Sequence, residues 1–527
     1  MRPYFRQSMA WLHTWGSVVI GWLLFFVFVT GTASCFMYDT TRWMEPERPL
    51  ELTLSQAPQA MQAEWALDFL ARHAPAAHKW EIKLPHTRNQ PDNGGASRTR
   101  LVARAFPERS NWEFDPLTGQ KLPPLEVRAT EGGEAFRNLH HKLYYMDEVV
   151  GIYIVGVVAV LALASLVTGV IAHKKIFKDF FTFRPRKGQR SWLDVHNVTS
   201  VMALPFFVMI LWTGLVYFNH HYFPVPAEIM ESAVSDRPAR QFDAAALPVP
   251  RPQAPLAPMI AQAEAILGQG QIGQIWVEHR AGEPSVVDIS RPWGTELPRT
   301  KNTDTFIRFD ALTGERLPAT YAEGPGRTML LALIALHEAW FASYPLRWLY
   351  FLSGLLGCFM IATGMVLWVL KRRERHAREG SAASFGLRLV ARLNVGVLAG
   401  LPVGVAAYFW ANRLLPVTMD GRAEWELHGL FATWGWLILY AVLRPEKRAW
   451  VEVLALAALA FGLIPLLNAL TTDKHLGVTL AAGDWGLAGS DLTMLGLAAM
   501  FAAMAARLWR KWQQAGQPAA SIRERAT

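Results

Sequence analysis

Eight long apolar runs constrain the fold of this chain more than any other feature of its sequence. They begin near residues 9, 147, 198, 346, 388, 426, 449 and 488. Most are long enough to cross about 30 Å of hydrocarbon as a helix of about 20 residues. The run around 426–443 is the shortest, and it could be re-entrant or tilted. The sequence therefore predicts an α-helical integral membrane protein.

Basic residues in the connections between these runs predict how the chain is inserted. Lys and Arg in short connections are retained on the cytoplasmic side of a membrane. The segment before the first run is basic, and so is every second connection after it, above all residues 174–191. We therefore expect both termini and this basic loop in the cytoplasm. Because topology explains most of the net charge of +9, we expect no nucleic-acid partner.

Two long connections, residues 40–146 and 219–345, fall on the opposite side of this topology. Each contains an alternating apolar strand pattern that runs into Asp-x-x-Thr-Gly, in the stretches NWEFDPLTGQKL and FIRFDALTGERL. The glycine of this motif suits a turn with positive φ. A helical pattern precedes the strands in each connection, so we predict two small α+β domains outside the membrane.

Residues 1–375 contain an internal repeat. His13 and His196 each stand seventeen residues before a Thr-Gly pair, and His140 and His337 each head a run that also ends near one. The four pairs are Thr30-Gly31, Thr168-Gly169, Thr213-Gly214 and Thr363-Gly364. The unit of span, outer domain and span therefore occurs twice, with transmembrane helices expected at 9–39, 147–173, 192–218 and 346–370. Residues 386–512 match neither copy, and we expect them to form a separate C-terminal four-span region.

Four histidines occupy equivalent places in this repeat. His13 and His196 lie at the inner ends of spans, whereas His140 and His337 lie at the outer ends. A duplication that puts equivalent histidines at one depth brings two imidazoles together, as bis-histidine ligation of a haem iron requires. A single histidine at a helix end is more often hydrogen-bonded in the membrane interface. Because the histidines come in two repeat-related pairs, we predict two b-type haems, one near each face.

Other histidines remain alternatives for these sites. His173 ends the second run on the inner side, at the depth of His13 and His196. His220 and His221 end the third run on the outer side. Each could replace a ligand at its own depth or bind a haem propionate, so the exact pairing of the ligands stays open.

Several long motifs resemble the PepSY-associated transmembrane family, often called iron-regulated membrane proteins, which includes inner-membrane siderophore reductases. They are LHTWGSVVIGWLLFFVFVTGTASCFMYDTTRWMEPE, HKKIFKDFFTFRPRKGQRSWLDVHN, LPFFVMILWTGLVYF and the two Asp-x-x-Thr-Gly hairpins. The resemblance covers residues 1–375 densely, and the motifs occur in the order that the family has them.

The resemblance implies a four-helix haem-binding core, periplasmic PepSY-type domains and an inner-membrane location in a bacterial cell. The protein would then be an oxidoreductase, a ferric-siderophore reductase that transfers one electron outside the inner membrane. The four repeat-related histidines stand at the family's histidine positions, and His173 stands at one typical of this subgroup. Phe207 stands where close relatives often have His, which implies that a ligand or proton-handling role is absent there. Residues 386–512 exceed the minimal family core.

The electron donor and the alternative function are less constrained. No nucleotide-binding Gly-rich fingerprint appears in an inner loop, so we do not expect NAD(P)H or flavin to bind this chain directly. The electron donor stays open between quinol and a separate cytoplasmic reductase. The alternative is a non-redox, membrane-anchored regulator whose PepSY-type domains bind a periplasmic partner.

Overall fold

The computed structural model describes residues 3–50, 56–85, 100–108, 110–173, 180, 184, 189–222, 247–279, 281–292, 297, 306–318 and 325–514. Most of the basic loop predicted at 174–191 lies outside these described residues. The chain divides into two compact units. The first contains residues 1–50, 127–212 and 348–527, and the second contains residues 51–126 and 213–347.

Within the described ranges, seven helices are long and apolar enough to cross a membrane, and a bent helix pair makes eight if the pair is counted as one span. Five are single helices: α1 (Pro3–Ser34), α5 (Glu148–Ala172), α13 (Tyr344–Arg378), α16 (Arg422–Leu443) and α20 (Trp485–Gln514). Two are composite: α14 (Phe385–Asn394), the π-helix η2 (Val395–Ala399) and α15 (Gly400–Leu414) form one, and α17 (Glu446–Gly462) with α18 (Ile464–Thr471) forms the other. The protein is therefore a multi-pass membrane protein, and the shortest predicted run belongs to one continuous helix.

The span expected at 192–218 is bent rather than straight. Its two halves, α7 (Gln189–Met202) and α8 (Leu204–Tyr217), meet at an angle of 62°. Pro205 stands in the first turn of α8. Proline has no N–H to continue a helix, and its ring clashes with the carbonyl four residues earlier, so α7 cannot run through this position. The first turn of a new helix tolerates proline, which explains why the helix restarts there.

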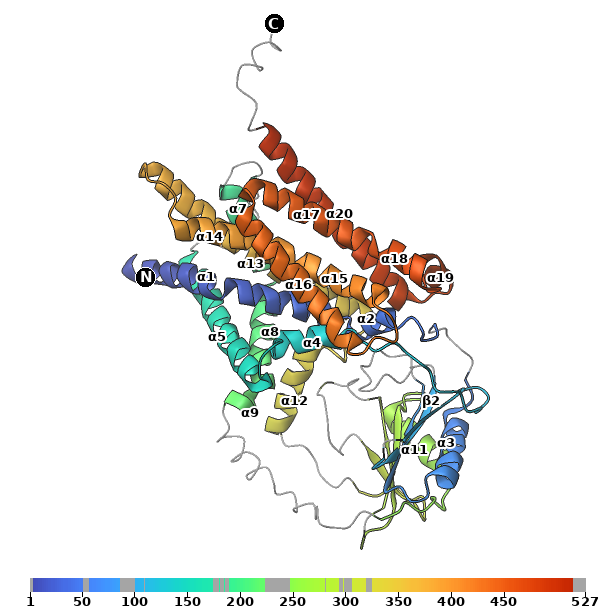
Figure 1. Ribbon diagram of the computed structural model, residues 1–527. Helices are drawn as coiled ribbons and strands as arrows, with labels where there is room; N and C mark the ends of the chain where they lie inside the picture. The colour runs from blue at the N-terminus through green and yellow to red at the C-terminus, as the bar shows by residue number, and fades with distance from the viewer. Residues whose placement is uncertain are drawn as a thin grey trace. The chain divides into compact units, whose positions relative to one another are not determined.

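Residues 386–512 pack directly on the first span instead of standing apart from it. In the first unit, α1 packs along α5, α15 along α16, and α17 along α20 (Figure 1). Phe26 of α1 stacks on Trp434 of α16, with ring centroids 5.4 Å apart and an interplanar angle of 6°. The Trp22 indole donates to the Asn394 side chain at 2.9 Å, and Asn394 donates to the Met365 carbonyl at 3.2 Å. The C-terminal spans are thus part of the same membrane core.

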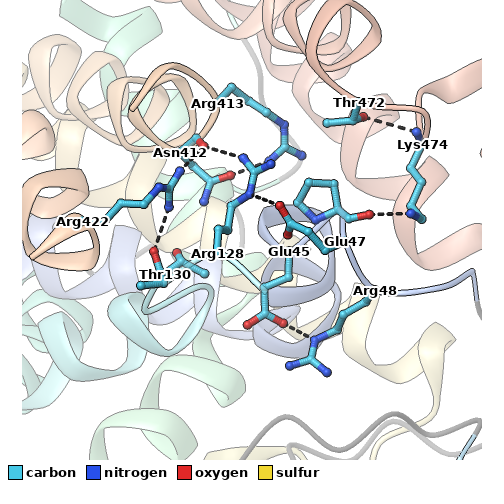
Figure 2. Close-up of polar contacts among 12 residues, drawn as sticks. Glu45, Glu47, Arg48, Arg128, Thr130, Asn412, Arg413, Arg422, Thr472 and Lys474 are labelled. Atoms are coloured by element: carbon cyan, nitrogen blue, oxygen red, sulfur yellow. Dashed lines mark hydrogen bonds and ion pairs between the residues drawn. The ribbon is translucent and has the colours of Figure 1, made fainter. Parts of the chain in front are cut away.

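Buried charges join the C-terminal spans to the segment before α4 (Glu134–His141) (Figure 2). Arg422 and Glu426 begin α16, have fully buried side chains and form an ion pair at 2.5 Å. Glu426 also accepts from Asn412 at 2.7 Å and from Thr130 at 2.5 Å. Arg422 donates to the Ala129 carbonyl at 2.8 Å. Because removing one partner of a buried pair leaves an uncompensated charge, the joint depends on all of these groups together.

A second set of buried polar contacts involves α2 (Met37–Met44), near α19 (Leu476–Ala481) and α20. Arg42 pairs with Asp484 at 2.5 Å. The Arg413 guanidinium lies 3.8 Å from the centre of the Trp43 ring, donates to the Trp43 carbonyl and contacts Asn468 at 3.0 Å. Burying these cations is tolerable because each is hydrogen-bonded or stacked.

In its described residues, the second unit forms one six-stranded antiparallel sheet with the strand order β3-β2-β1-β4-β5-β6. The strands are β1 (Lys79–Lys83), β2 (Leu101–Phe106), β3 (Ser110–Phe114), β4 (Gln274–Glu278), β5 (Val286–Ser290) and β6 (Ile307–Asp310). Two helices, α3 (Gln59–His73) and α11 (Leu256–Leu267), pack beside each other and against the strands (Figure 1). They close a core with Trp80, Ile275 and Phe309. The unit also includes α9 (Asn219–Tyr222) and α12 (Pro325–Glu338).

The two outer connections share this sheet, whereas we expected one α+β domain from each. Strand β1 of the first connection pairs antiparallel with β4 of the second. In two separate three-stranded sheets, one side of β1 and one side of β4 would be unpaired. The β1–β4 pairing covers these two edges. The row Ile82, Ile275, Ile289 and Ile307 crosses the joint on the core face, so the apolar layer is continuous. Residues 40–146 and 219–345 therefore each supply half of one sheet.

Both Asp-x-x-Thr-Gly turns form as predicted. The Asp115 carboxylate accepts from the N–H groups of Leu117 and Thr118 at 2.9 and 2.8 Å, and Gly119 has φ of 70°. The N–H bond from Thr118 holds the pKa of Asp115 below its ordinary value. The second turn repeats this geometry around Asp310, with φ of 75° at its glycine.

A disulfide across the β1–β4 joint should form if the two connections share one sheet. Lys79 and Glu278 are register partners, and opposed Cα atoms of an antiparallel pair lie about 4.5–5.5 Å apart, within disulfide reach. We expect Lys79→Cys/Glu278→Cys to migrate faster on a non-reducing denaturing gel, because the bond closes a long loop. The control Lys79→Cys/Asp310→Cys places its second cysteine two strands further away and should not shift. Equal mobility of the two variants would contradict the single sheet.

Glu426→Ala should destabilise the membrane unit strongly, because it leaves Arg422 buried without its carboxylate, at a cost of about 3–5 kcal/mol. The matched control is Glu452→Ala, which removes an ion pair to Arg444 whose side chains are 35% and 40% exposed. Exposed pairs contribute about 0–1 kcal/mol, so the control should stay near wild type. Heating in detergent followed by size-exclusion chromatography gives both unfolding midpoints. Similar midpoints would show that the buried pair does not support the joint.

Candidate functional site

Two of the four repeat-related histidines lie close together in the first unit. The imidazole rings of His13, on α1, and His196, on α7, have centroids 6.5 Å apart and an interplanar angle of 57°. Two imidazoles that bind one metal ion from opposite sides, each through a nitrogen at about 2 Å, have ring centres roughly 6 Å apart. The predicted inner pair is therefore brought together with a spacing that suits a shared metal.

Each of these rings is fixed by a backbone carbonyl of a facing helix. His13 Nδ1 lies 2.8 Å from the Ser165 carbonyl on α5, and His196 Nδ1 lies 2.9 Å from the Met360 carbonyl on α13. A carbonyl only accepts hydrogen bonds, so Nδ1 carries the proton and Nε2 keeps its lone pair. Metal-binding histidines are typically oriented by such a bond from their other ring nitrogen.

A glycine on the facing helix makes room for each ring. A Cβ atom at Gly169 would lie 3.0 Å from His13 Cε1, and one at Gly364 would lie 3.2 Å from His196 Cε1. Each glycine stands four residues after the carbonyl that holds the ring. The hydroxyl of the preceding threonine, Thr168, bonds the same Ser165 carbonyl at 3.2 Å. The Thr-Gly pairs thus form the seats of the histidines, a role that their spacing in the sequence did not indicate.

His140 has the same seat in the first unit. Its Nδ1 lies 2.8 Å from the Val27 carbonyl of α1, and a Cβ atom at Gly31 would lie 2.7 Å from its ring. Thr30 donates to the same carbonyl at 3.1 Å. Burial lowers the pKa of His140, which lies on α4 outside the spans, and so favours the neutral imidazole. A neutral ring with a protonated Nδ1 presents an unprotonated Nε2.

His337 lies in the second unit and shows a related seat. Its Nδ1 lies 3.1 Å from the Thr213 hydroxyl, and a Cβ atom at Gly214 would lie 2.9 Å from its ring. His140 and His337 belong to different units, so their pairing stays a prediction. All four Thr-Gly pairs nevertheless contact one of the four predicted histidines.

The alternative histidines occupy less specific positions. His173 caps the end of α5, where its N–H bonds the Gly169 carbonyl at 3.1 Å. His220 and His221 lie side by side on α9, with ring centroids 4.1 Å apart. These residues remain alternatives for ligation or for contact with a propionate.

The position where relatives of the suggested family often have His is apolar here. Phe207 is fully buried and packs edge-on against Phe28, with ring centroids 6.0 Å apart. Among the described residues, no group of three or more His, Cys, Asp or Glu side chains is arranged to hold a metal ion. A haem needs only two axial protein ligands, so the His13–His196 pair remains the candidate.

Comparison with known proteins supports the family resemblance. The chain is 26% identical over 413 residues to the uncharacterized protein PA4219 of Pseudomonas aeruginosa, across 72% of this chain and 95% of that protein. The model of the PepSY-associated TM region matches residues 10–371, which include all four seated histidines and the strands of the sheet. Because this match covers well over half of the sequence, the chain belongs to the family defined by the PepSY-associated TM region.

Proposed function

We propose that this protein is a di-haem b electron-transfer protein of the bacterial inner membrane that reduces ferric siderophore on the periplasmic side. Both termini lie in the cytoplasm in this proposal. The observation that carries it is the seating of the histidines, above all the His13–His196 pair at 6.5 Å. Each ring is held by its Nδ1 against a facing helix, and Nε2 is left for iron.

The chain's own residues would define the properties of such a site. A bound haem would supply a one-electron iron couple. The carbonyls of Ser165 and Met360 fix the tautomer of their histidines and increase the basicity of Nε2. Gly169 and Gly364 allow the rings to lie against the helix backbone. The buried apolar side chains of the spans exclude water, which favours electron transfer over side reactions at the metal.

Reduction is a chemically sufficient way to release iron from a siderophore. Fe(III) is a hard acid that oxygen donors hold tightly, and the same donors hold Fe(II) less tightly. One electron delivered to the ferric chelate therefore weakens it without any bond to the protein. The resemblance of the sequence motifs to iron-regulated membrane proteins is the ground for this substrate class, and a quinol or a cytoplasmic reductase would supply the electron.

The haem content of the purified protein should be near two per chain, because four histidines have Thr-Gly seats. Pyridine haemochrome spectra against protein mass give this ratio, and the dithionite-reduced haems should be reoxidised by ferric siderophore. A ratio of one would mean that one histidine pair is not a site. A reduced spectrum without a b-type α-band would refute the proposal and favour a non-redox regulator that binds a periplasmic partner.

His13→Ala should remove one haem or convert it to a high-spin form, because one strong axial ligand is lost. Gly169→Val should have a similar effect without replacing a ligand, because even a Cβ atom added at Gly169 would lie 3.0 Å from the His13 ring. The control His376→Ala removes a partly exposed imidazole whose Nδ1 lies 2.8 Å from the Ser381 hydroxyl. Absorption and EPR spectra of the three variants provide the measurement.

The same measurements on a fourth variant, His173→Ala, decide the role of His173. If His173→Ala changes one haem and His13→Ala leaves a six-coordinate, two-haem spectrum, His173 is the ligand and our assignment of His13 is wrong. If only His13→Ala and Gly169→Val change the haem spectrum, His13 and His196 are the ligands.

A further inference from the structure

We infer that Arg372 and Trp368 bind a propionate carboxylate of the haem held by His13 and His196. This inference rests on the proposed function and adds a second binding group to the same site. It starts from a stack of one guanidinium and two indole rings on α1 and α13, separate from the histidine seats.

The guanidinium of Arg372 is held between two tryptophans. Its Cζ atom lies 3.6 Å from the centre of the Trp368 ring and 4.6 Å from that of Trp15. The two indoles meet edge to face, with centroids 5.9 Å apart and an interplanar angle of 82°. Stacking on aromatic faces fixes a guanidinium while leaving its N–H groups in the ring plane available as donors.

Along α1, the stack lies within one helical turn of His13. On α1, Trp15 is two residues from His13, a rise of about 3 Å. On α13, Gly364, Trp368 and Arg372 are four residues apart in turn, so they share one face of the helix. Gly364 is the seat of His196, and helical side chains lean toward the N-terminus, which directs Arg372 toward that seat.

Among the described residues, neither the Arg372 guanidinium nor the Trp368 indole has a hydrogen-bond acceptor. In the part of the chain that the structure describes, the Arg372 guanidinium has no carboxylate partner, whereas its neighbour Arg373 pairs with Glu446 at 3.0 Å. The Trp368 indole nitrogen is buried and has no hydrogen-bond partner among the described residues. A buried N–H without an acceptor is unfavourable, and an anion beside a half-buried cation is stabilised by its charge.

A haem propionate meets both requirements. It is an anionic carboxylate with two oxygens, one for a guanidinium N–H and one for an indole N–H. It would enter the site with the group that the histidines bind, so its position is set by their depth. A lipid phosphate would also accept from an arginine, but nothing fixes it beside the His13–His196 pair.

Electrostatics gives this contact a measurable effect. A fixed positive charge beside the haem stabilises the reduced iron relative to the oxidised iron, which carries one more positive charge. Arg372→Gln should therefore lower the midpoint potential of one of the two haems and shift its propionate bending band in resonance Raman spectra. Haem content should stay unchanged, because both histidine seats are intact.

The experiment uses the full-length holoprotein with Arg373→Gln as the matched control. This control removes one charge from the adjacent position, where the side chain is 40% exposed and paired, and should leave both potentials and the propionate bands unchanged. Arg372→Lys keeps the charge but not the planar donors. Its midpoint potential should therefore stay close to that of the wild type, while its propionate band should shift less than that of Arg372→Gln. Trp368→Phe keeps the aromatic ring and should alter the propionate band alone.

The outcomes separate this inference from the proposed function. Wild-type protein without haem overturns the proposed function and this inference together. Wild-type protein with two haems, but no change of potential or propionate band in Arg372→Gln, overturns the inference alone. Where Arg372→Gln fails to fold, an unchanged propionate band in Trp368→Phe overturns it equally.

Discussion

The bond between a histidine Nδ1 and the backbone of a facing helix is the interaction on which the membrane unit depends. A buried imidazole is costly unless its polar atoms are paired, and in the spans the available acceptors are helix carbonyls. Reaching such a carbonyl needs close approach, which only a glycine on the facing helix permits. The Ser165 carbonyl and Gly169 meet this need together for His13. Helix packing and ring orientation are therefore set by the same contact.

The C-terminal spans extend this core through contacts of a different kind. Asn394 links the Trp22 indole to the Met365 carbonyl, one residue from the glycine that seats His196. The buried Arg422–Glu426 pair then fixes the start of α16 against the segment before α4. Buried polar groups of this kind need all their partners in place. The four extra spans thus support the environment of the candidate site, although they lie outside the duplicated part of the sequence.

The features predicted from sequence are those that local patterns determine. Apolar length located the spans, and the turn chemistry of Asp115 and Asp310 gave the two hairpin turns. The single sheet was missed, because the pairing of β1 with β4 joins strands about 200 residues apart and leaves no local signal. The burial of Arg422 was missed for the same reason: its partners come from three separate segments. Pro205 indicates a break in the helix, but the span was predicted from its apolar length alone, so the bend was missed.

The seats also explain how a duplication can build a shared site. In the first repeat, α1 carries His13 and also Gly31, the seat of His140 on α4, and α5 carries Gly169, the seat of His13. The second repeat has the same reciprocal plan, with His196 seated at Gly364 and His337 at Gly214. Each ring is thus oriented within its own repeat, by contacts that need no cofactor. The distance between His13 and His196 then depends on how α1 and α7 pack together, because these two helices carry rings from different repeats. A site built this way has its ligand directions fixed in advance, and packing of the repeats adjusts only the gap between them.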